Sequence, residues 1–286
     1  MTIVDAHQHL WDLERGKYEW LSPEYGPLYR TFTADELEPQ LRRAGVDATV
    51  LVQAADTLQD TESMLAVADR VAWVAGVVGW VPLTDPAGRD AALERFTAHS
   101  AFRGVRHLIH EEPDPDWVLQ EAVRDGLRTL AARGLTFDVV AVLPRHLEHV
   151  PILARAIPDL RIVVDHLAKP PIKDRGWQPW ADLLAAAAEH ENVFAKVSGL
   201  NTAADPEHWT ATDLAPYIDH ALACFGAERL MFGGDWPVAI LAGDYQKVWE
   251  ETNRALAGLS DAERAAVLGG TALHFYGLRD RVGAER

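Results

Sequence analysis

Short apolar runs alternate with segments of helical periodicity along most of the chain. The runs are rich in valine, isoleucine and leucine, which is typical of strands buried on both faces. Between them, apolar side chains recur every three or four residues, as on one face of an amphipathic helix. The predicted strands are residues 3–9, 48–53, 75–81, 102–109, 135–140, 160–166, 193–198 and 230–234. The predicted helices are residues 33–45, 61–71, 90–99, 117–133, 146–156, 180–190, 214–225, 248–256 and 261–268.

Eight strand–helix units predict an α/β protein, specifically a (β/α)8 TIM barrel. An open, doubly wound sheet is the main alternative, but no Gly-x-Gly-x-x-Gly motif follows the first predicted strand. Since no shift in composition marks a domain boundary, we expect residues 1–286 to form one domain. The last dozen residues look like a solvated tail.

The segment at about residues 11–32 is too long for an ordinary strand–helix connection and too aromatic for a plain linker. We predict that this insertion loop forms a lid or wall over the mouth of the barrel. A surface loop packed by its own aromatic side chains is the alternative. The aromatic residues of the segment are Trp11, Tyr18, Trp20, Tyr25 and Tyr29.

Composition narrows the class of partner. The formal net charge of −16 and the pI of about 5.1 argue against nucleic acid and anionic membrane surfaces, which attract basic patches. A small-molecule substrate fits better. The single cysteine, Cys224, cannot form an internal disulfide, and no signal peptide is evident, so a cytoplasmic location is expected. The sequence leaves the oligomeric state open and is compatible with a homo-oligomer.

The first predicted strand ends in His7-Gln8-His9. Side chains alternate between the faces of a strand, so both imidazoles point the same way and converge on one small volume. Such a pair suits a divalent metal, and Asp235, which follows two glycines after the last strand, can complete the site. His7, His9 and Asp235 are therefore candidate ligands of one divalent ion such as zinc. Two structural histidines, and an N-cap role for Asp235, are the alternatives.

Other chemically active side chains also follow predicted strands, and the carboxyl ends of the strands form the active-site face of a barrel. Several of them are cationic, which suits a substrate or transition state that carries negative charge. For Lys169 and Lys196, a solvated surface position is an equal alternative. The residues at these strand ends are Gln53, Arg106, His107, Asp138, His166, Lys169, Lys196 and Ser198.

With these motifs, the chain resembles the amidohydrolase superfamily, and within it the branch of sugar-acid lactonases. The resemblance extends from end to end and is carried by residues 4–11, 102–106, 164–170, 196–200 and 231–237. It implies an amidohydrolase-type barrel that hydrolyses an aldonolactone of the L-fucono, L-galactono, D-arabino or L-rhamno series. Metal dependence varies within the branch, so both a zinc enzyme and a metal-independent enzyme agree with the resemblance.

The resemblance also implies roles for individual residues. Asp235 would activate water and His166 would assist at the carbonyl. Beyond the resemblance, the cationic and hydrogen-bonding side chains at the strand ends make Arg106, together with His166, our first choice for stabilising the oxyanion, with His107 and Lys196 in reserve. Sugar hydroxyls would bind polar side chains such as Gln53, and the sugar ring would pack on Trp11 and Trp236.

A binuclear metal site is excluded by the strand ends. It needs a bridging lysine after the fourth strand and histidines after the fifth and sixth, whereas this chain has Arg106-His107 and Asp138 at the first two positions. A mononuclear site formed by His7, His9 and Asp235, with His166 as an additional candidate ligand, is the most that these residues support. The alternatives to a sugar lactonase are a metal-dependent decarboxylase, a lactonase of a dicarboxylated pyrone, and a non-catalytic sugar-acid binding protein.

Overall fold

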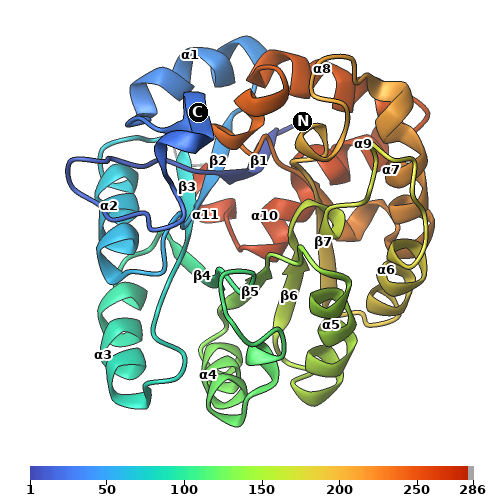
Figure 1. Ribbon diagram of the computed structural model, residues 1–286. Helices are drawn as coiled ribbons and strands as arrows, with labels where there is room; N and C mark the ends of the chain where they lie inside the picture. Colours follow the sequence, from blue (N-terminus) through green and yellow to red (C-terminus); the bar gives the residue numbers. More distant parts are fainter. Residues whose placement is uncertain (283–286) are drawn as a thin grey trace.

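The computed structural model describes residues 1–282, which form an eight-stranded parallel barrel (Figure 1). Each strand pairs with the next along the chain, and a parallel bridge between Gln8 and Trp236 joins the last strand region to the first. The predicted (β/α)8 TIM barrel is therefore confirmed. The strands are β1 Val4–Gln8, β2 Ala48–Val52, β3 Val74–Gly79, β4 Phe102–His107, β5 Thr136–Val139, β6 Arg161–Val164, β7 Val193–Val197 and β8 Leu230–Phe232.

The helices are α1 Ala34–Ala44, α2 Leu58–Ala68, α3 Pro86–Thr97, α4 Glu121–Ala132, α5 Pro144–Ala156, α6 Trp180–Ala188, α7 Ala211–Phe225, α8 Tyr245–Ala255, α9 Asp261–Ala265, α10 Thr271–Phe275 and α11 Arg279–Val282. Helices α1 to α8 surround the barrel and cover the outer faces of the strands, whereas α10 and α11 lie near the centre of the view in Figure 1. Some predicted boundaries were wrong by a few residues. α2 begins at Leu58 rather than at residue 61, because the Thr57 side chain accepts a hydrogen bond from Asp60 N and caps the helix there.

The end of the chain closes the amino-terminal end of the barrel, so the expectation of a solvated tail was wrong for Phe275, Tyr276 and Leu278, which are buried. Phe275 and Tyr276 pack with Val50 and Val163 from inside the barrel, and Phe275 and Leu278 are fully buried. These apolar side chains fill the barrel axis where the strands begin. Residues 283–286, also part of the expected tail, lie outside the described residues.

The aromatic segment at residues 11–32 is held both by contacts within itself and by a contact with the barrel. Trp11 and Phe32 form an antiparallel bridge, and the indole N–H of Trp11 donates to Arg30 O at 2.6 Å. The indole N–H of Trp20 donates to Ala54 O at 2.7 Å, just after β2. The segment thus forms a fixed wall at the carboxyl end of the barrel. No helix within residues 1–282 is long and apolar enough to cross a membrane.

Candidate active site

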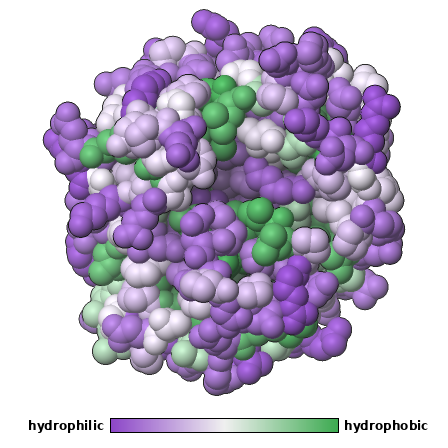
Figure 2. Space-filling view, in the orientation of Figure 1, coloured by the Kyte–Doolittle hydropathy of each residue, from purple (hydrophilic) through white to green (hydrophobic). Residues whose placement is uncertain are grey.

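A cavity of about 210 Å³ opens at the carboxyl ends of the strands. This is below the range of about 300–1,000 Å³ for sites of drug-sized ligands, so it suits one small molecule. Figure 2 shows the surface hollowed near its centre, with hydrophilic and hydrophobic residues around the hollow. Trp11, Trp20 and Tyr25 contribute an aromatic wall. The polar lining includes His9, Arg106, His110, His166, Lys169 and Asp235.

A larger cleft of about 890 Å³ lies at the opposite end, where the strands begin. Trp73, Arg103 and Arg281 are among its lining residues, and none of the predicted site residues is. The chemistry predicted from the sequence therefore belongs to the smaller cavity.

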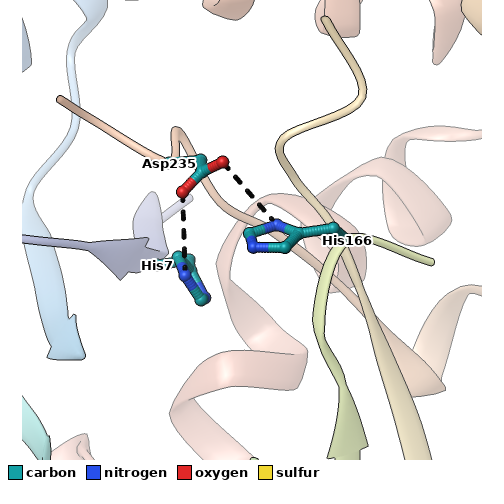
Figure 3. A group of neighbouring side chains, drawn as sticks. All are labelled: His7, His166 and Asp235. Atoms are coloured by element: carbon teal, nitrogen blue, oxygen red, sulfur yellow. Dashed lines mark ion pairs between the residues drawn. The ribbon is translucent and has the colours of Figure 1, made fainter. Parts of the chain in front are cut away.

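The two carboxylate oxygens of Asp235 face different histidines, one towards His7 and the other towards His166 (Figure 3). Its Oδ1 is 3.5 Å from His9 Nε2 and 3.8 Å from His7 Nε2, and its Oδ2 is 3.9 Å from His166 Nδ1. The backbone after β8 fixes this position, because Asp235 has a φ of 52° and its N–H donates to His7 O at 2.8 Å. The Asp235 carboxylate does not cap the following helical turn, which starts after Pro237, so the N-cap alternative was wrong.

His166 stands on an unusual turn after β6. Residues 166–169 all have left-handed backbone conformations, with φ values of 56°, 49°, 58° and 50°, although none is glycine. This turn brings His166 Nδ1 to 2.8 Å from Ser198 Oγ. Opposite it, Gly199 has a φ of 58°, and a Cβ there would lie 2.5 Å from Asp235 Oδ2 and 2.7 Å from His166 Nδ1. Only glycine leaves room for this pair.

A buried ion network supports the histidines from below. Lys196 Nζ lies 2.6 Å from Asp138 Oδ2, 3.0 Å from Asp165 Oδ1 and 3.0 Å from His7 Nδ1. Arg106 pairs with the other oxygen of Asp165 at 3.1 Å. All five side chains are buried. Lys196 therefore lies beneath the histidines and does not line the cavity, unlike the reserve role predicted for it.

The histidine pair of β1 converges as expected, with His7 Nε2 and His9 Nε2 3.0 Å apart. His9 Nδ1 donates to Val52 O at 2.8 Å, so His9 Nε2 carries a lone pair that faces Asp235. The Val52 carbonyl thus orients the His9 ring, and the Lys196 ammonium orients the His7 ring.

Burial and the neighbouring side chains together set the protonation states around the cavity. It lowers the pKa of His166 to about 3 and also lowers the pKa of His9. Burial alone would raise the pKa of Asp235. The neighbouring His166 and His9 and the charge of Lys169 together outweigh burial and hold this pKa well below its usual value. At neutral pH, the site presents neutral imidazoles beside an ionised carboxylate.

These protonation states fit a divalent metal, which binds neutral imidazole and ionised carboxylate. Ligand atoms of His7, His166 and Asp235 lie within 4.8 Å of one another (Figure 3). Asp235 Oδ2 is buried without a hydrogen-bond partner among residues 1–282, which leaves a lone pair for such an ion. The geometry groups His166, the additional ligand that the sequence suggested, with His7 and Asp235, and His9 lies directly beside the three.

His107 is turned away from the cavity. Its Nδ1 accepts a hydrogen bond from the Trp80 indole at 2.9 Å, and its Nε2 lies 2.7 Å from Glu112 Oε1. Its ring also stacks on Trp117 at 3.9 Å. Because both nitrogens are engaged, His107 supports the loop after β4 and does not contribute to the lining. His110, three residues further on, faces the cavity instead, and sequence reasoning missed it.

Gln53 and Trp236 also lie behind the cavity wall. The backbone carbonyl of Gln53 accepts from Arg106 at 2.6 Å, and Gln53 is fully buried. The Trp236 ring packs edge-on against Phe32 at 5.2 Å. Of the residues predicted to bind substrate, Arg106 and Trp11 are the two that line the cavity.

A barrel that holds an ionised carboxylate, neutral histidines and a metal-competent cluster at its strand ends belongs to the class of barrel enzymes that activate water. The chain belongs to the Amidohydrolase family, which it matches over residues 4–278.

Relatives of this chain include two lactonases. It is 41% identical over 282 residues to an L-fucono-1,5-lactonase of Burkholderia ambifaria, covering 96% of this chain and 94% of the relative. It is 34% identical over 293 residues to an L-fucono-1,5-lactonase of Burkholderia multivorans, covering 99% and 98%. A crystal structure of an amidohydrolase from Burkholderia multivorans with bound zinc is 32% identical, with a TM-score of 0.89, covering 97% of this chain and 100% of the other. The 2,6-dihydroxybenzoate decarboxylase and a 2-pyrone-4,6-dicarboxylic acid hydrolase of Pseudomonas putida are more distant, at 14% and 26% identity and TM-scores of 0.67 and 0.72.

Proposed function

We propose that this protein hydrolyses a sugar-acid lactone, such as L-fucono-1,5-lactone or a related aldonolactone, to the open sugar acid. One observation carries the proposal: Asp235 Oδ2 is buried beside His166 at the cavity, without a hydrogen-bond partner among residues 1–282. An ionised, unpartnered carboxylate is suited to take a proton from water. The two lactonase relatives support the choice of substrate class.

In this mechanism, Asp235 accepts a proton from water as the water oxygen attacks the lactone carbonyl. His166 and Arg106 stabilise the negative charge that develops on the carbonyl oxygen. Arg106 suits this role because it lines the cavity and its Nε–H has no partner in the described part of the chain. Protonated Asp235 then returns the proton to the departing ring oxygen as the ring bond breaks.

We further propose that His7, His166 and Asp235, with His9 beside them, hold a zinc ion when one is bound. Such an ion would lower the pKa of water and polarise a carbonyl. The zinc-bound relative supports this choice of metal.

Replacing the carboxylate tests the proposal. Asp235→Asn should lower kcat at least about 10³-fold towards a panel of aldonolactones, measured with a pH indicator, because the base is lost. Asp174→Asn, an exchange of the same kind at an exposed loop position, serves as the control. Circular dichroism and thermal melting would establish that both variants are folded.

Three outcomes would contradict the proposal. Near-normal turnover by Asp235→Asn would remove Asp235 from the mechanism. Release of carbon dioxide from an aromatic acid, with no lactone hydrolysed, would indicate a decarboxylase. Thermal stabilisation by sugar acids without turnover of any lactone would indicate a binding protein.

The partner that we propose is a small-molecule lactone. A cytoplasmic location is proposed with it, since Cys224 is the single cysteine of the chain and is free. Assembly into a homo-oligomer stays a prediction.

A further inference from the structure

Two basic side chains, Arg106 and Lys169, line the cavity, and neither has its hydrogen-bonding capacity filled by carboxylates. The two terminal nitrogens of Arg106 donate hydrogen bonds to the Asp165 carboxylate and to the Gln53 backbone carbonyl. Its Nε–H is buried without a partner within residues 1–282. Lys169 Nζ donates to two neutral oxygens, Thr202 Oγ1 at 3.0 Å and Gly199 O at 3.4 Å. A buried N–H of a cation with nothing to bind indicates a place for an external acceptor.

A strained stretch of backbone positions Lys169. A left-handed residue other than glycine is strained because its Cβ crowds the following carbonyl oxygen, and residues 166–169 form four such residues in succession. Lys169 N donates to His166 O at 2.9 Å across this turn, and the indole of Trp180 donates to Leu167 O at 2.6 Å. Strain of this kind is retained where it positions functional groups. Here it brings the His166 ring and the Lys169 stem to the same cavity.

The reaction changes the charge of the bound molecule. Water adds to the neutral lactone, the ring C–O bond breaks, the ring oxygen gains a proton, and the new carboxylic acid releases a proton to solvent. The product is therefore a carboxylate anion, and the substrate is not. Cations at the cavity wall favour this product over the substrate, because hydrogen bonds to an ionised acceptor are the stronger kind.

We propose that Lys169 and Arg106 form a carboxylate-binding subsite for the anion of an open-chain polyhydroxy acid. This inference rests on the proposed function. It gives the cavity a preference for anionic over neutral open-chain sugars and makes the product a competitive inhibitor.

Binding measured without turnover tests the subsite. By titration calorimetry, the protein should bind sodium L-fuconate at least about 10-fold more tightly than neutral L-fucitol, which matches it except at the carboxylate. Lys169→Met should lose most of this preference, and Lys169→Arg should keep most of it. Lys173→Met removes the same charge at an exposed position nearby and should leave the preference unchanged.

Equal affinity for L-fuconate and L-fucitol would overturn the subsite, as would an unchanged preference in Lys169→Met. Lys169→Gln provides a second uncharged variant in case Lys169→Met fails to fold, which thermal melting would reveal. Hydrolysis of the aldonolactone panel is measured separately and tests the proposed reaction. Lactone turnover without anion preference rejects the subsite alone, and anion preference without lactone turnover rejects the proposed reaction.

Discussion

The exchange Lys196→Met probes the buried ion network beneath the histidines. It keeps the length and bulk of the side chain and removes one positive charge. Lys196 and Arg106 balance Asp138 and Asp165, and all four side chains are buried, so the variant would leave one excess negative charge inside the barrel. Uncompensated buried charge is among the most destabilising changes that a protein can suffer.

The expected cost is large. Breaking a buried ion pair on one side costs about 3–5 kcal/mol. For a chain of this size, each kcal/mol lowers the melting temperature by about 2 °C, so Lys196→Met should melt about 6–10 °C lower than the wild type. Activity should fall too, because His7 Nδ1 loses the ammonium 3.0 Å away that orients its ring.

A second exchange makes the reasoning refutable. Asp138→Asn removes one carboxylate, and the amide oxygen can still accept the hydrogen bond that Tyr276 donates to Asp138 at 2.8 Å. The double variant Lys196→Met/Asp138→Asn restores the charge balance, so it should melt higher than Lys196→Met alone. If the two exchanges simply add their costs in thermal melting, charge balance is not what stabilises the network.

Two further predictions use other parts of the structure. Gly199→Ala should abolish most turnover in the lactone assay, because its Cβ would lie 2.5 Å from Asp235 Oδ2 on a left-handed backbone; full activity would show that the turn can yield. Burial raises the pKa of Asp60 to about 6, despite hydrogen bonds from Ala54 and Ala55 N–H. The native state therefore holds a proton that the unfolded state releases near pH 4, and this group disfavours folding increasingly as pH rises from 4 to 6. In urea unfolding, Asp60→Asn should thus gain stability relative to the wild type between pH 4.5 and 7.5; a pH-independent difference would contradict the raised pKa.

The barrel could be predicted because its strands are buried on both faces. Strands such as Val74–Gly79 and Arg161–Val164 read as nearly unbroken apolar runs, and the helices between them carry one apolar stripe. Helix starts were less certain, since a cap such as Thr57 is a single polar residue among many.

The rule that active sites lie at strand ends located Asp235, His166 and Arg106. It could not tell which residues after a strand face the cavity, because this depends on the backbone of each loop. The left-handed turn at residues 166–169 contains no glycine, so nothing in the sequence signals it. Lys196 lies within β7 rather than after it, and it points into the barrel beneath the site.

The closure of the barrel sets the order in which a newly made chain becomes an enzyme. His7 and His9 leave the ribosome early. The segment that pairs with one edge of their strand is made only when Trp236 is reached, and the apolar side chains that fill the barrel below them come later still, with Tyr276. Until then, the strand has an open edge that can pair with other chains. A premature stop shortly before residue 276 would therefore yield a protein that contains every proposed catalytic residue but lacks the apolar side chains that close the barrel beneath them.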